Sequence, residues 1–243
     1  VVTELAGAGT DTVQTTLASY TMAANVENLT FTNTSAHSGI GNVLANVMTG
    51  NSGADTLDGG AGADTLAGGA GNDTLNGGAG DDTLDGGAGA DSLYGNNGED
   101  WLEGGDGADK LYGGADSDYL YGDAGADKLY GDLGRDTLTG GTQADIFAFT
   151  AGSTAATRSG ADRITDFLHT ERDRISLAAI DANTSLAGDQ AFTFIGGADF
   201  HHVAGELQYA SGSVSGDTNG DGVADFVFDL LGLPALVKGD FVL

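Results

Sequence analysis

The stretch Gly59-Gly-Ala-Gly-Ala-Asp64-Thr-Leu66-Ala is one of eleven successive nine-residue segments that fill residues 50–148. Glycine prevails at the first, second and fourth places, aspartate stands at every sixth place, and an apolar residue stands at every eighth. The apolar series contains ten leucines from Leu57 to Leu138, followed by Phe147. A disordered acidic linker has no reason to keep two residue types at fixed places, so the period predicts a regular repeating fold.

Each copy is expected to form a turn over its first six residues and a short strand over its last three. Glycine permits the positive φ angles and close backbone approach that such turns need. Strand alternation then directs the eighth-place side chain inward and its two neighbours outward. Two copies make one coil of eighteen residues, so the sequence predicts an all-β, parallel β-roll with a thin leucine core.

The sixth-place aspartates are predicted to lie in rows, each above the aspartate eighteen residues later. Two carboxylates about 5 Å apart repel by roughly 1 kcal/mol in water, and by several times more at a lower effective dielectric. Calcium takes six to eight oxygen ligands, which carboxylates and turn carbonyls supply. Nine pairs follow, and hence about nine Ca2+ ions. The predicted ligands are Asp55, Asp64, Asp73, Asp82, Asp91, Asp100, Asp109, Asp118, Asp127, Asp136 and Asp145.

Some copies depart from glycine. Asp116 and Gln143 occupy the fourth place, and Asn51, Asn96, Asp123 and Asp132 occupy the second. Asn and Asp tolerate left-handed backbone geometry better than most residues, so these turns are expected to survive. Gln143 is the least tolerant replacement and is predicted to mark the end of the regular roll.

A second calcium site is predicted in the segment Asp217-Thr-Asn219-Gly-Asp221-Gly-Val223-Ala-Asp225. Its oxygen-bearing side chains and its glycine match most of an EF-hand-type loop, although Phe228 replaces the glutamate at the twelfth place. The predicted site consists of Asp217, Asn219, Asp221, Val223 and Asp225. The alternative is a hairpin turn rich in Asn-Gly and Asp-Gly.

Composition excludes several functions. The net charge is −28 with eight Lys and Arg, which would repel nucleic acid. No apolar run is long enough for a membrane span, the start shows no signal-peptide pattern, and the absence of cysteine excludes disulfides. There is no His-Glu-x-x-His or Gly-x-Ser-x-Gly motif, so no catalysis is predicted for this chain.

The flanking regions lose the period. Residues 1–49 are predicted to form a β-rich N-terminal cap, and residues 149–243 a β-rich C-terminal cap. Short strands are expected at residues 163–167, 174–177, 205–209, 225–228 and 240–243.

Residues 50–148 resemble the RTX β-roll of proteins exported by type I secretion. The segment from about residue 144, with Ile164-Thr-Asp-Phe167, Arg174-Ile-Ser-Leu177 and Asp240-Phe-Val-Leu243, is similar to the C-terminal domain of serralysin-type metalloproteases and of mannuronan epimerase R-modules. The resemblance implies calcium-dependent folding outside the cell, a transient type I secretion partner, an uncleaved C-terminal export signal and a catalytic part upstream. For residues 240–243 the alternative is a last edge strand.

Aromatic residues also recur. Tyr94, Tyr112 and Tyr130 are spaced by eighteen residues with Lys110 and Lys128 two places before the last two, so all five should share one sheet face. Trp101, Tyr119 and Tyr121 should lie on the opposite sheet. One interpretation is that the C-terminal region docks over these aromatics. The other is that they bind an acidic polysaccharide or a cell surface.

Overall fold

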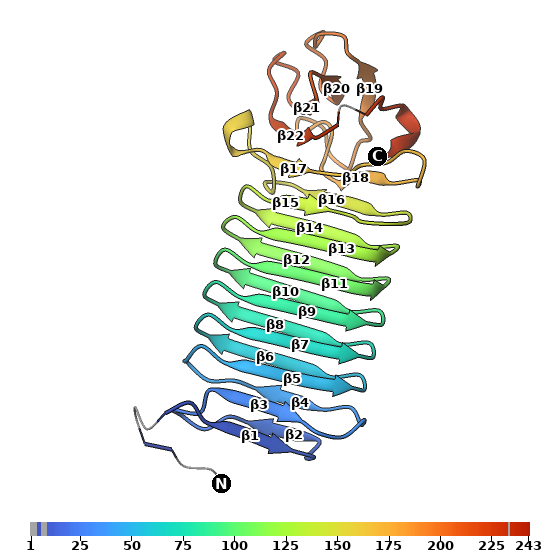
Figure 1. The fold of residues 1–243 in the computed structure, drawn as a ribbon. Helices are drawn as coiled ribbons and strands as arrows, with labels where there is room; N and C mark the ends of the chain where they lie inside the picture. Colours follow the sequence, from blue (N-terminus) through green and yellow to red (C-terminus); the bar gives the residue numbers. More distant parts are fainter. Residues whose placement is uncertain (1–3, 6–8, 233) are drawn as a thin grey trace.

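The computed structural model of the chain describes residues 4–5, 9–232 and 234–243. It consists of two long sheets, sheet A and sheet B, wound together into a solenoid of about eight turns (Figure 1). Sheet A contains, in spatial order, β1 (Thr12–Thr15), β3 (Asn28–Phe31), β5 (Val47–Ser52), β7 (Thr65–Ala70), β9 (Thr83–Ala88), β11 (Trp101–Gly107), β13 (Tyr119–Gly125), β15 (Thr137–Thr139), β17 (Asp162–Ile164), β22 (Phe226–Leu230), β21 (Ser213–Asp217), β20 (Glu206–Ala210) and β19 (Thr193–Gly196).

Sheet B contains β2 (Ser19–Thr21), β4 (Ser38–Ile40), β6 (Thr56–Ala61), β8 (Thr74–Ala79), β10 (Ser92–Asn97), β12 (Lys110–Ala115), β14 (Lys128–Leu133), β16 (Ile146–Thr150), β18 (Arg174–Ala179) and β23 (Phe241–Val242). Two short 3-10 helices, η1 (Arg158–Gly160) and η2 (Lys238–Asp240), lie between strands of the C-terminal region.

The strands of the repeats pair in parallel with a constant offset of one coil. Leu57 lies opposite Leu75, Leu75 opposite Leu93, and on the other sheet Leu66 lies opposite Leu84. Because each coil is two nine-residue copies long, the same place of the repeat always meets itself. The predicted all-β parallel β-roll is confirmed.

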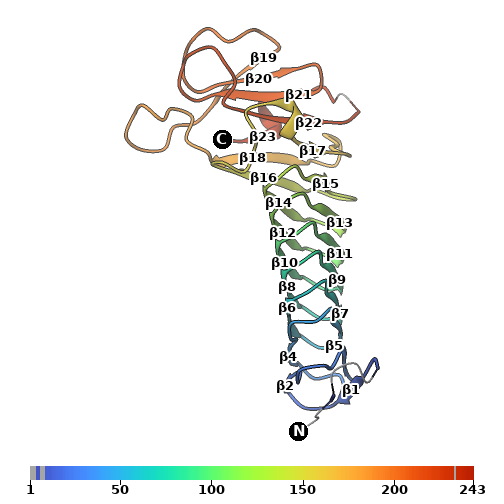
Figure 2. The ribbon, with the colours of Figure 1, turned by 90° about the vertical axis from the view of Figure 1, so that its left-hand side faces the viewer.

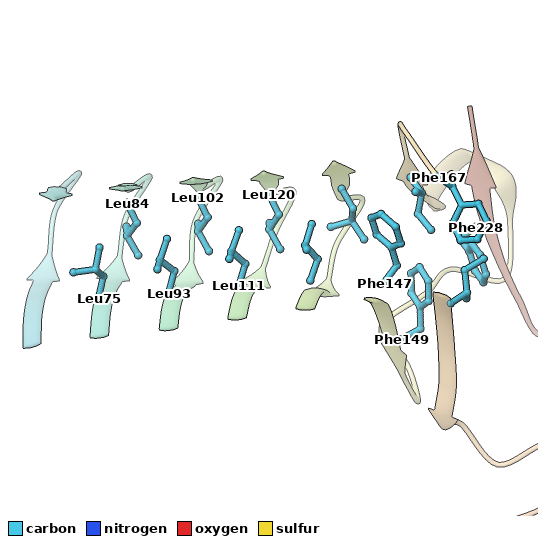
Figure 3. Packing of buried hydrophobic residues seen from close by; sticks show 14 of the residues in the cluster. Leu75, Leu84, Leu93, Leu102, Leu111, Leu120, Phe147, Phe149, Phe167 and Phe228 are labelled. Carbon is cyan, nitrogen blue, oxygen red and sulfur yellow. The ribbon is translucent and has the colours of Figure 1, made fainter. Parts of the chain in front are cut away.

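The core is a double column of leucines. Leu75, Leu93 and Leu111 point inward from sheet B toward Leu84 and Leu102 of sheet A, and all are fully buried (Figure 3). Burying a leucine contributes about 1.5–3 kcal/mol, and each nine-residue copy supplies only one such side chain. The core is therefore thin along the repeats, and it widens where aromatic residues join it at the C-terminal end. Those residues include Phe147, Phe149, Phe167 and Phe228.

The parallel ladder passes through both ends of the nine-residue repeats. Strand β5 straddles the predicted boundary at residue 49/50, and β16 straddles the one at 148/149. Beyond the repeats the offset between paired strands grows from 18 residues to 26 for Thr137 and Arg163, and to 28 for Ile146 and Arg174. The three-part division of the chain stays a prediction, and residues 1–3 and 6–8 of the predicted N-terminal cap lie outside the described residues.

The C-terminal region continues the roll at its end (Figures 1 and 2). In sheet A, β22 pairs with β17 in parallel, and β21 and β20 then follow in antiparallel order. In sheet B, β23 pairs in parallel with β18, and Phe241 is buried. Residues 241–242 thus form the last edge strand that was the alternative for the C-terminal segment, while its role as an export signal stays a prediction.

The six non-glycine residues at glycine places all have positive φ angles, as expected. The values run from 64° at Asp132 to 99° at Asn51, and Gln143 has 84°. The turn that contains Gln143 precedes β16, the strand after which the offset reaches 28 residues. The prediction that Gln143 lies at the end of the regular roll is confirmed.

Candidate metal-binding sites

The sixth-place aspartates form two buried rows. Row A runs from Asp64 to Asp136 and consists of the aspartates that directly precede strands of sheet A. Row B runs from Asp55 to Asp145 and consists of those that directly precede strands of sheet B. Each aspartate is at most 2% exposed. The backbone N–H of each of the first nine donates to the Oδ1 atom of the aspartate eighteen residues later, at 2.7 Å from Asp64 to Asp82 and 2.9 Å from Asp100 to Asp118. The structure contains nine such bonds, so the nine predicted pairs are adjacent.

The second carboxylate oxygen, Oδ2, has no partner. In all eleven aspartates this atom is inaccessible to water and accepts no hydrogen bond. A buried polar atom without a partner costs about 1–3 kcal/mol, and more when it is charged. The rows therefore present eleven oxygens that nothing in the described protein satisfies.

Backbone oxygens lie near these unpaired atoms. A Cβ built on Gly50 would lie 2.5 Å from Asp55 Oδ2 and 2.7 Å from the carbonyl oxygen of Gly68, so both oxygens line one small space at the first-place glycine. The same pairing recurs at Gly59, Gly68, Gly86, Gly95, Gly104, Gly113 and Gly122. Among the described residues no three His, Cys, Asp or Glu side chains converge, so a cation here must take carbonyl oxygens as well. Carboxylate and carbonyl oxygens are the set that calcium prefers, and the residues fit that ion.

Burial also changes the acidity of the rows. Desolvation raises the pKa of Asp82 to about 7, and that of Asp118 to about 8, although a backbone N–H from the preceding coil lowers each value. The neighbouring carboxylates in the row raise both further. At neutral pH a large fraction of these groups would therefore be protonated unless positive charge reached them. A bound divalent cation would supply that charge.

Both rows extend beyond the predicted ligands. Asp136 N–H donates to Asp162 Oδ1 at 3.0 Å, and Asp145 N–H donates to Asp173 Oδ1 at 3.1 Å. Neither acceptor was predicted, because their separations of 26 and 28 residues break the period. A local signal was present, since Asp162-Arg-Ile and Asp173-Arg-Ile repeat the order of the sixth to eighth places.

At the other end the rows begin with residues that are not carboxylates. The N–H of His37 donates to Asp55 Oδ1, and that of Asn46 donates to Asp64 Oδ1, both at 2.6 Å. The buried His37 ring also places Nδ1 3.0 Å from Asp55 Oδ1.

The segment 217–225 forms the turn between β21 and β22. Asp217 is fully buried, with Oδ1 accepting from Gly220 N–H at 2.6 Å and Oδ2 from Gly222 N–H at 2.9 Å. Asp225 accepts from Asn219 Nδ2 at 2.9 Å, and Asp221 accepts from Val223 N–H at 2.8 Å. The five predicted residues are thus brought into one loop, which also joins an antiparallel hairpin. Its calcium binding stays a prediction.

The aromatic residues form stacks on the outer faces. The rings of Tyr94 and Tyr112 are 4.9 Å apart, and those of Tyr112 and Tyr130 are 4.6 Å apart. Lys110 and Lys128 are register partners on the same strands, with Lys128 Nζ 5.6 Å from the Tyr130 ring centre. The predicted stacking is confirmed.

The docking interpretation of these stacks is wrong. The C-terminal region lies beyond the end of the roll and not over its sides (Figure 2). Tyr94 remains 36% exposed, and on sheet A Trp101 and Tyr119 remain 39% and 46% exposed. Sequence spacing shows which side chains share a face, but it does not show where a distant segment packs.

Comparison with known proteins finds a family to which the repeat is similar. The family is described as the RTX calcium-binding nonapeptide repeat, and its pattern comprises four copies of the repeat. This pattern matches the overlapping ranges 40–75, 59–93, 68–102, 94–129 and 121–153. No curated protein matches the chain. Among solved structures, the AlgE6R3 subunit of the mannuronan C5-epimerase from Azotobacter vinelandii is 25% identical, with a TM-score of 0.42 over 58% of this chain and 77% of that chain. In the described ranges, no helix is long and apolar enough to cross a membrane. Residues 40–153 of this chain are therefore similar to RTX calcium-binding nonapeptide repeats.

Proposed function

We propose that this chain is a calcium-dependent folding module of a secreted protein, disordered without calcium and folded once calcium binds outside the cell. The observation that carries the proposal is the pair of buried aspartate rows with eleven unpaired Oδ2 atoms. A roll with a thin core and a net charge of −28 has little to offset their burial and mutual repulsion.

The proposed ligands are the eleven sixth-place aspartates together with carbonyl oxygens of the first-place glycines. When bound, calcium would supply positive charge between successive coils. About nine ions would bring the net charge from −28 to roughly −10. A backbone N–H of the preceding coil holds each Oδ1 in place, from His37 and Asn46 at the start of the rows and from aspartates thereafter, so that Oδ2 is left without a protein partner.

The supply of calcium provides the proposed switch. A site that exists only in the folded chain stabilises that state by mass action, so folding follows the free ion concentration. Where calcium is scarce, as inside a cell, the chain stays unfolded and can thread through a type I secretion apparatus. Where calcium is abundant, the rows are neutralised and the roll forms. The family resemblance supports this extracellular location and this transient partner.

Calcium titration of metal-stripped protein tests the proposal. Far-UV circular dichroism is expected to show a cooperative transition from coil to β-structure at submillimolar to millimolar calcium. Magnesium is the control and should leave the chain unfolded, because it demands an octahedral shell at shorter distances and keeps its waters. A stripped protein that is already folded at neutral pH would contradict the switch.

A second candidate function is binding of an acidic polysaccharide through the exposed tyrosine and lysine face of sheet B. The regular ring spacing of Tyr94, Tyr112 and Tyr130 favours it, since flat apolar rings beside Lys110 and Lys128 suit sugar rings that carry carboxylates. Tyr112→Ala is expected to weaken affinity for such a glycan by about tenfold, or about 1.4 kcal/mol, in calorimetry. Tyr121→Ala on sheet A is the control and should leave affinity unchanged. Equal affinity in both variants would exclude this face.

A further inference from the structure

Row A continues into a residue outside the repeats. Asp162 begins β17 and lies 26 residues after Asp136. Its Oδ1 nevertheless accepts the Asp136 N–H at 3.0 Å, the same kind of bond that the internal pairs make at 2.6–2.9 Å. Asp136 is 0% and Asp162 1% exposed. The geometry of the row is therefore preserved across a segment that has lost the nine-residue pattern.

Neither carboxyl group is neutralised by the protein. The Oδ2 atoms of Asp136 and Asp162 are both buried and without a hydrogen-bond donor, and the two carboxyl groups lie side by side. Within the described ranges, no Lys, Arg or His nitrogen comes within 4.0 Å of either group. Two adjacent buried carboxyls need either a shared proton or a shared cation.

Row B ends differently and provides an internal comparison. Asp173 accepts the Asp145 N–H on Oδ1 at 3.1 Å, and it accepts the Leu168 N–H on Oδ2 at 2.7 Å. The last turn of that row is covered by further carboxylates, with Asp166 accepting from Gly140 and Gly141 and Glu171 accepting from Gln143. Both oxygens of Asp173 are thus satisfied by the protein, whereas Asp162 keeps one unpaired.

We infer that Asp136 and Asp162 hold a divalent cation at a site of their own, and that this ion fastens the repeats to the C-terminal sheet. Strand β17 pairs with β15 of the last repeats on one side and with β22 on the other. Asp162 lies directly opposite Phe228 of β22, so an ion on Asp162 would stabilise the junction between the two parts. The inference rests on the proposed function in that the ion is the calcium that the repeats bind.

Calcium stoichiometry in two matched variants tests the site. Equilibrium dialysis with elemental analysis is expected to find one calcium fewer in Asp162→Asn than in the unmodified chain, and the unmodified number in Asp173→Asn. Amide hydrogen exchange in saturating calcium should be faster over residues 226–230 in Asp162→Asn alone. An unchanged number of ions in Asp162→Asn, with folding verified by circular dichroism, would overturn the inference in favour of a shared proton.

A measurement on the unmodified chain keeps the test independent of variant folding. Crystals grown with calcium should show an anomalous peak within about 2.6 Å of an oxygen from both Asp136 and Asp162. Peaks along the repeat rows without one here would overturn this inference and leave the proposed function intact. Absence of calcium from the rows as well would overturn both.

Discussion

Gly89→Ala is expected to prevent the β-roll from forming even in saturating calcium. Gly89 has a φ angle of +144°, and a Cβ built on it would lie closer than 3.0 Å to the carbonyl oxygen of Gly71 in the preceding coil. The new Cβ would clash with a backbone oxygen and not with a flexible side chain, so a change of rotamer cannot relieve the clash. A positive φ angle in a residue with a Cβ adds about 1–3 kcal/mol of strain to the clash. Calcium-induced circular dichroism should show no transition.

Asp116→Asn is the matched control for Gly89→Ala. Asp116 occupies the same fourth place, and its φ angle of 79° already accommodates a side chain. Asn tolerates this left-handed geometry, so the calcium midpoint should stay within about twofold of the original. A Gly89→Ala variant that folds at the original calcium concentration would refute the close approach of successive turns.

Metal-stripped protein is expected to gain β-structure as the pH falls from about 8 to about 4. Burial raises the pKa of Asp118 to about 8, of Asp127 to about 7 and of Asp91 to about 6. In the unfolded chain these groups titrate near 3.9. Between these values the folded state binds more protons, so its stability is greatest below the unfolded pKa and is lost as the pH rises through 6 to 8.

With calcium present the dependence should reverse, because protons compete with the ion for the same carboxylates. The calcium concentration at the folding midpoint is expected to rise as the pH falls below about 6. Circular dichroism at fixed pH values measures both trends, and sedimentation excludes aggregation near the isoelectric point of about 4.1. A stripped chain that is as unfolded at pH 4 as at pH 8 would show that carboxylate charge does not oppose folding.

The repeats could be predicted closely because their structure is local. An eighth-place leucine and a sixth-place aspartate at a fixed phase determine the inward face, the register and the rows, and the structure shows all three. The expected short strands of the C-terminal region also appear, as β17, β18, β20, β22 and β23. The order of β22, β21, β20 and β19 in sheet A depends on pairings between segments that are far apart in the sequence. The C-terminal region has no repeat from which these pairings could be predicted.

The ends of the rows could not be predicted for a related reason. Asp162 and Asp173 follow insertions of different length, so counting by eighteen misses them, while the three-residue pattern Asp-Arg-Ile is too short to stand out in a chain with 36 acidic residues. The position of the C-terminal region relative to the tyrosine faces was likewise open. That position depends on which C-terminal strand pairs with the last strand of each sheet. The sequence around Tyr112 does not indicate this pairing.

The hydrogen bonds of the aspartate rows all run in one sense along the roll, from the backbone N–H of one coil to the carboxylate of the next. The two ends of the solenoid are therefore chemically unequal. The first residue of each row only has to donate to the row, which His37 and Asn46 do without a carboxylate. The last coil must accept, and Asp162 and Asp173 are carboxylates. Within a row, a cut at the beginning therefore leaves a carboxylate oxygen without its donor, whereas a cut at the far end leaves a backbone N–H without its carboxylate acceptor, so each row has a polarity.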